Sequence, residues 1–153
     1  MGKIDGYVQG WLRHRSVLLE LLQGIDNEHT HFKPWNQAYS LGSLAVHIVS
    51  STDMFVQAVK NGEFVPPSAS NPFETMDDVR RIVQEYTEKT KDELQSLTED
   101  QLEQIVVVNQ FSAPGKAWIN TAKEHEIHHK GQLFTYTRMI GVEKVPFFLN
   151  TAL

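Results

Sequence analysis

Apolar residues recur at the spacing of amphipathic helices in four separate stretches of this chain. Such spacing places the apolar side chains of each helix on one face, which must be buried against another helix. Between the last two stretches, Ile105–Val108 is a β-branched run, predicted as either a short extended segment or a buried connector. The sequence therefore predicts an all-α fold, a four-helix bundle with long connections. The helices are expected over residues 4–24, 40–60, 75–97 and 112–140.

Local signals mark where these helices begin and end. Gly24, Gly62 and Gly141 stand at the ends of the first, second and fourth stretches, where glycine commonly ends a helix. Thr75 and Asp78 match a capping box at the start of the third. We expect the last twelve residues to fold back over the bundle.

Length and charge exclude several classes of protein. The 153 residues, 41% of them hydrophobic, suit a single helical domain over residues 1–153. A net charge of −5 argues against a nucleic-acid partner, which needs a basic excess. No apolar run approaches the ~18 residues of a membrane span. The N-terminal residues lack a secretory apolar core, so we expect a cytoplasmic protein.

The chain contains no cysteine, which limits the chemistry it can perform. Disulfides, thiolate zinc fingers, iron–sulfur clusters and cysteine nucleophiles are excluded. A metal site must therefore use histidine, aspartate, glutamate or water as ligands.

Three of the seven histidines fall on predicted inward helix faces. His125 and His129 lie one turn apart at the centre of the predicted buried stripe of the fourth helix. His47 shares the inward face of the second helix with Leu44 and Ile48. Unpaired imidazoles are costly to bury, whereas one divalent cation satisfies all three. This favours a three-histidine metal site; the alternative is a set of core histidines that are hydrogen-bonded to neighbours.

Three further histidines are expected to be solvated at the surface, because they lie on polar segments: His14, His29 and His31. His128 falls on the flank of the fourth helix.

Residues 125–129 also match His-Glu-x-x-His, the zincin signature, with Glu126 as candidate general base. The longer form of that signature requires glycine where this chain has Gln132, and too few residues follow for a protease catalytic domain. Glu126 remains a candidate proton acceptor at the rim of the site. The alternative is a solvated carboxylate on the helix flank.

Two segments resemble the DinB/YfiT-like family of small four-helix metalloproteins. Residues 40–48, SLGSLAVHI, are similar to the family's second-helix opening, and residues 125–133, HEIHHKGQL, to its His-x3-His-[Arg/Lys]-Gly-Gln segment. The resemblance implies His47, His125 and His129 as metal ligands. Gln132 matches the motif's glutamine, and we expect it, with Tyr136, to lie beside the ligands.

The resemblance also implies a homodimer, zinc or nickel as metal, and activity toward low-molecular-weight thiols such as bacillithiol. We therefore expect an S-transferase acting on small electrophiles. The alternatives are a metal-dependent hydrolase, a non-catalytic metal or small-ligand binding module, and a structural homodimer with core histidines. The mouth of the pocket is expected to contain Trp35, Tyr39, Phe111 and Tyr136. A dimer is favoured because three other aromatic residues exceed what the bundle needs: Trp11, Phe147 and Phe148.

Overall fold

The structure, a computed structural model, describes residues 2–67 and 70–153. The four long helices and a two-stranded antiparallel hairpin account for most of this part, and the prediction of an all-α four-helix bundle is confirmed. No helix in these ranges is long and apolar enough to cross a membrane. The elements are α1 (Lys3–Gln23), η1 (Asn27–His29), α2 (Leu41–Asn61), α3 (Met76–Gln95), α4 (Glu99–Glu103), β1 (Ile105–Val108), β2 (Phe111–Pro114) and α5 (Gly115–Met139).

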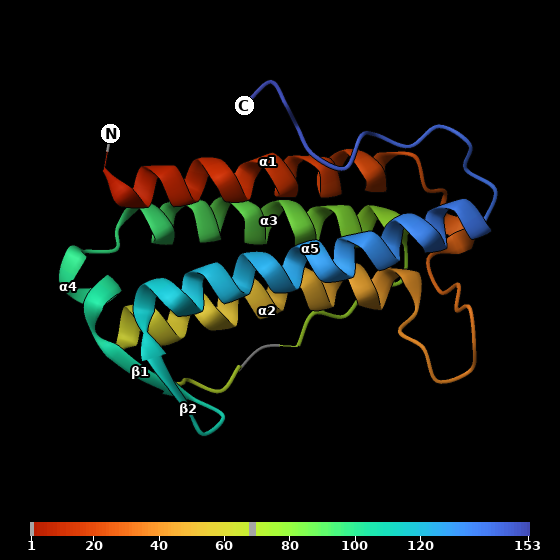
Figure 1. The fold of residues 1–153 in the computed structure, drawn as a ribbon. Helices are drawn as coiled ribbons and strands as arrows, with labels where there is room; N and C mark the ends of the chain where they lie inside the picture. The colour runs from red at the N-terminus through yellow and green to blue at the C-terminus, as the bar shows by residue number, and fades with distance from the viewer. Residues whose placement is uncertain (1, 68–69) are drawn as a thin grey trace.

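The helices form a closed ring in which α1 contacts α3 and α5, and α2 contacts the same two helices. In Figure 1, α1 and α5 run in one direction and α2 and α3 in the other. The connection between α2 and α3 therefore runs along the length of the bundle (Figure 1), as the predicted long connections require.

The helix ends agree with the local signals, with one correction. Ser40 and Thr75 cap α2 and α3 through their side-chain oxygens, and Gly62 ends α2 at a φ of 75°. The fourth long helix begins at Gly115 rather than near Ser112, because residues 112–114 pair with residues 105–107 in the hairpin.

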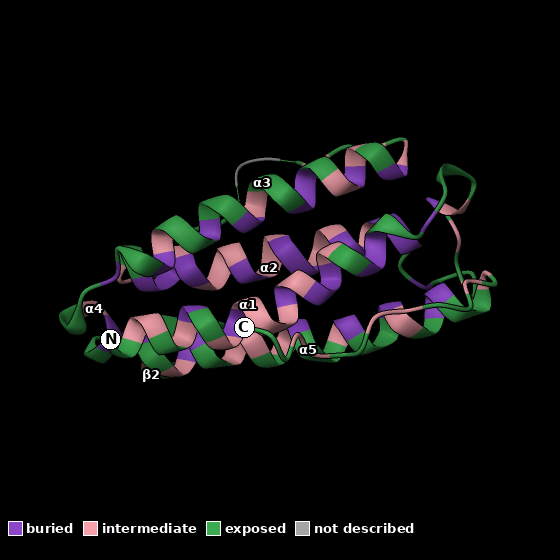
Figure 2. Cartoon of the chain, turned by 90° about the horizontal axis from the view of Figure 1, so that it is seen from above, coloured by how far each residue is buried: buried purple, intermediate pink, exposed green. Residues whose placement is uncertain are grey.

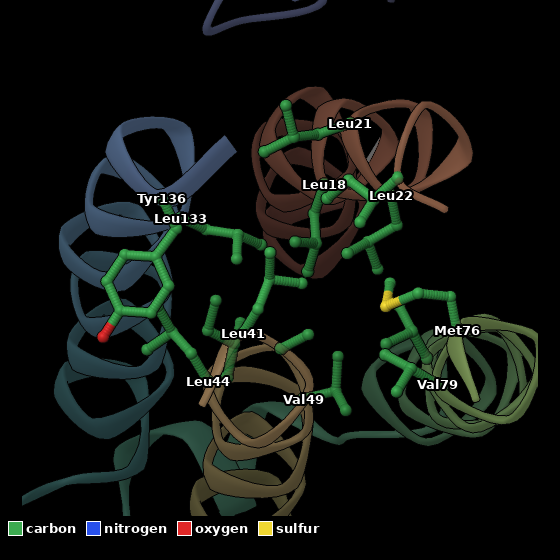
Figure 3. Packing of buried hydrophobic residues seen from close by; sticks show 14 of the residues in the cluster. Leu18, Leu21, Leu22, Leu41, Leu44, Val49, Met76, Val79, Leu133 and Tyr136 are labelled. Atoms are coloured by element: carbon green, nitrogen blue, oxygen red, sulfur yellow. The ribbon is translucent and has the colours of Figure 1, made fainter. Parts of the chain in front are cut away.

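The core consists of two apolar clusters that share all four long helices. Figure 3 shows the first, in which leucines of α1 meet Leu44 of α2, Val79 of α3 and Leu133 of α5. The second surrounds Trp118 near the hairpin. Buried residues line the inner helix faces, while the outer face of α3 is exposed (Figure 2).

The C-terminal segment folds back along α1, as predicted (Figure 1). The backbone N–H of Asn150 donates to the carbonyl of Arg13 at 2.9 Å, and its side-chain Nδ2 donates to Ser16 Oγ at 3.2 Å. The Lys130 ammonium, which is buried, donates to the carbonyl of Phe148. These bonds hold the segment on both α1 and α5.

Candidate metal centre

The structure brings His47, His125 and His129 together between α2 and α5. One potential ligand atom from each residue lies within 4.8 Å of those of the other two. The ring centroids are 5.1 Å apart for His47 and His125, 4.8 Å for His47 and His129, and 4.4 Å for His125 and His129. Because α2 packs closely against α5, two ligands one turn apart on α5 meet the single ligand of α2. The three residues could hold a metal ion.

The hydrogen bonds of the rings fit such an ion. His129 Nδ1 lies 2.7 Å from Gln132 Oε1, and His47 Nδ1 lies 3.4 Å from the hydroxyls of Tyr39 and Ser51. A ring fixed through Nδ1 presents Nε2 to a metal. In the described part of the chain, His125 Nδ1 is buried and has no hydrogen-bond partner. A buried unpaired nitrogen is costly, and a cation would relieve this cost if it bound His125 through Nδ1.

Burial keeps His125 and His47 in the neutral form that binds metal. Burial, reinforced by the neighbouring His129, lowers the pKa of His125 to about 4 and lowers the pKa of His47. Both imidazoles are therefore neutral at pH 7, as metal coordination requires.

The position of the histidines on α5 corrects the predicted stripe. His125 and His129 lie at the edge of the buried face, half-buried, rather than at its centre. The centre is occupied by Glu126 and Lys130, which are 0% and 2% exposed. The triad therefore lies near the surface, where a ligand from solvent has access to it.

Glu126 is not at the rim of the site, and it is not solvated on the helix flank. Its carboxylate accepts from Arg15 at 2.8 and 2.7 Å, from Trp11 Nε1 at 3.0 Å and from Thr52 Oγ1 at 3.2 Å. Arg15 also donates to Thr87 Oγ1 at 3.0 Å. This cluster, named the buried ion-pair network, joins all four long helices. The hydropathy pattern does not predict this network, because a charged residue in an amphipathic helix is expected on the solvent face.

His14 is a further correction, because it is half-buried rather than solvated. Its Nδ1 accepts from Lys130 Nζ at 2.9 Å, and burial together with that cation lowers its pKa to about 4. Burial in turn lowers the pKa of Lys130 to about 8. His31 is exposed, as predicted, and His128 is exposed as well. His29, half-buried, lies 3.4 Å from the carboxylate of Glu28.

A cavity of about 410 Å³ adjoins the triad and includes His129 in its wall. Trp35, Tyr39 and Tyr136 line it, as predicted for the pocket mouth, and so does Gln132. We name it the aromatic cavity. Phe111 is not part of it, because this residue lies on β2, where its side chain is 71% exposed.

The chain has relatives of known sequence and structure. The model of the DinB family matches residues 1–151. An uncharacterized protein of Bacillus subtilis strain 168, YjoA, is 38% identical over 144 residues, which span 92% of this chain and 93% of that protein. The crystal structure of a DinB-like protein, YjoA from Bacillus subtilis, superposes with a TM-score of 0.86 at 34% identity, covering 95% of this chain and 99% of that one.

More distant structures share the fold. A DinB-like protein from Bacillus cereus has a TM-score of 0.80 at 20% identity, covering 94% of this chain and 95% of its own. A conserved protein from Enterococcus faecalis has a TM-score of 0.68 at 14% identity, covering 93% of this chain and 99% of its own. At these identities the likeness concerns the fold alone.

Proposed function

This chain belongs to the DinB family, whose model matches residues 1–151, and on that premise we propose that it is a divalent-metal-dependent S-transferase. It would join a low-molecular-weight thiol, such as bacillithiol, to a small electrophile. The observation that carries the proposal is the three-histidine cluster, in which one potential ligand atom of each residue lies within 4.8 Å of those of the other two. Three protein ligands leave coordination positions free, the arrangement of catalytic rather than structural sites.

His47, His125 and His129 would hold the cation. Zinc and nickel are both metals that imidazole ligands suit. When bound, such a cation lowers the pKa of an incoming thiol or water, so that the deprotonated form is present at neutral pH. The protein's own part is to hold the rings: Gln132 fixes His129, while Tyr39 and Ser51 contact His47.

The reaction requires no oxidant or reductant. A carbon–sulfur bond forms as the bond between carbon and the leaving group breaks, and the leaving group departs with the bonding electron pair. The thiol proton passes to water. A metal-bound thiol is deprotonated outright and needs no general base, whereas a metal-bound water has a pKa of about 7 and benefits from one. Glu126, the carboxylate predicted for that task, is fully buried and bound to Arg15, which favours transfer over hydrolysis.

Turnover with and without a thiol tests the proposal. We expect the metal-loaded protein to consume an electrophile such as monochlorobimane only when a thiol is supplied, and to lose this activity on chelation. Glu126→Gln should reduce turnover only mildly per folded molecule, because the carboxylate does not accept the proton. Hydrolysis without thiol that falls by about 10²-fold in Glu126→Gln would favour the hydrolase. Inactivity toward broad panels of both substrate kinds would favour the binding module.

We also propose that the protein is a homodimer, from the family resemblance and from two exposed aromatic residues near the C-terminus. Phe147 and Phe148 are 65% and 54% exposed. Trp11, which was also expected to favour a dimer, does not support one, because it is buried within the bundle and donates to Glu126. Sedimentation at micromolar concentration should give a dimer, and Phe147→Ser with Phe148→Ser should weaken it. A wild-type species of 17.5 kDa would contradict the proposal.

A further inference from the structure

The aromatic cavity lies beside the triad and includes one of its three residues, His129, in its wall. We propose that it binds the electrophilic substrate, and that this substrate is an uncharged molecule carrying an aromatic ring. Calling the ligand the substrate rests on the proposed function. The binding of an uncharged aromatic molecule does not.

The walls of the cavity are built for a flat apolar ligand. Trp35 and Tyr39 come from the connection before α2, and Tyr136 and Met139 from the end of α5. Three of these side chains are largely exposed: Trp35 at 63%, Met139 at 55% and Tyr39 at 47%. Large apolar side chains gathered around a concave surface are typical of a ligand site. Their faces can stack on an aromatic ring.

The side chains of the cavity wall favour an uncharged ligand over an ionic one. Among the residues that the structure describes, those lining this cavity include no Asp, Glu, Lys or Arg. Two cavities beside α3 differ in this respect, because Lys89 lines both of them. Arg81 and Glu85 also line the first, and Asp53 also lines the second. An ionic group that entered the aromatic cavity would lose water without gaining a charged side chain of the wall as its partner, which is unfavourable.

Two contacts fix the cavity relative to the triad. The Tyr136 hydroxyl donates to the Tyr39 carbonyl at 3.0 Å, which ties α5 to the connection before α2. The Tyr39 ring stacks on His47, with centroids 4.8 Å apart and an interplanar angle of 22°. Tyr39 therefore belongs to both the cavity wall and the surroundings of the triad. A ring held in the cavity would lie next to His129.

The volume suits a substituted ring. An enclosed apolar cavity of about 150 Å³ is sufficient for benzene, and small-molecule sites begin near 300 Å³. At about 410 Å³, the aromatic cavity has room for a ring and its reactive substituent.

A matched pair of fluorescent probes tests the proposal without catalysis. N-phenyl-1-naphthylamine is uncharged, and 8-anilinonaphthalene-1-sulfonate has the same rings with an added sulfonate. We expect the uncharged probe to bind about tenfold more tightly, both to the protein as purified and after treatment with EDTA. Trp35→Ala should weaken its binding roughly tenfold, because a stacking surface is lost. Circular dichroism would verify that each variant is folded.

Two further variants sharpen the test. Phe111→Ala is the matched control, because Phe111 is also an exposed aromatic residue but lies outside the cavity, and this variant should leave both affinities unchanged. Thr135→Arg brings a cation into the cavity wall, and should weaken the uncharged probe while strengthening the sulfonate. Equal losses in Trp35→Ala and Phe111→Ala, or a probe preference that Thr135→Arg leaves unchanged, would overturn the proposal.

The outcomes separate this inference from the proposed function. Selective probe binding without any thiol transfer would leave the cavity assignment standing and refute the transferase. Thiol transfer combined with unchanged probe binding in Trp35→Ala would do the reverse.

Discussion

Alanine variants of His47, His125 and His129 should each lose stoichiometric metal, because the cation then keeps only two protein ligands. The measurement is the metal content of untagged protein after dialysis. A second readout is thermal unfolding. Metal that binds only the folded state raises stability, by about 4 kcal/mol when its concentration is a thousandfold above Kd. That increase should be present in the wild type and absent from all three variants.

The remaining histidines provide matched controls. His31→Ala and His14→Ala should keep full metal, because neither ring is part of the three-residue cluster. His128→Ala is the strictest control, since its ring centroid lies only 4.8 Å from that of His129 but the residue is exposed and outside the cluster. Full metal retention in His47→Ala would contradict a site shared between α2 and α5.

The sequence was sufficient to select these three residues because their geometry is local. A spacing of four residues places His125 and His129 on one side of any helix, and His47 lies on an apolar face of another. Their depth could not be derived in the same way. It depends on Glu126 and Lys130, whose burial is possible only because Arg15 and His14 meet them from α1. One signal was present: Arg15 lies four residues after Trp11 and three before Leu18, on the apolar face of its own helix.

The hairpin is a second feature that local sequence signals could not predict. Helix ends follow from short-range capping, so Thr75 and Gly62 could be recognised from sequence. Ser112–Pro114 is compatible with the start of a helix or with a strand, and pairing with β1 decides between them. The turn is made by Asn109 and Gln110 with φ of 48° and 74°. Glutamine rarely adopts positive φ, so no turn signal marked the hairpin.

Glu126→Gln should cost the metal-free protein about 3–5 kcal/mol of unfolding free energy. The substitution preserves the shape of the side chain but removes its charge, which leaves the Arg15 guanidinium buried without a counter-ion. For a chain of this size, the melting temperature should fall on the order of 10 °C. Urea unfolding in EDTA measures the loss without a contribution from bound metal.

Glu103→Gln is the matched control. Glu103 pairs with Lys116 at 2.9 Å, but both side chains are about half exposed, and water takes the place of the lost partner. This variant should unfold at the same urea concentration as the wild type.

A double variant identifies the cause of the loss. In Arg15→Met with Glu126→Gln no unpaired charge remains, so it should be less destabilised than the sum of the two single variants. Additive losses would mean that the two side chains contribute through packing alone. The ion pair matters to the site because Glu126 lies next to His125 on α5. Its bonds to Arg15 of α1 and Thr52 of α2 hold the turn of α5 that follows His125 against these two helices.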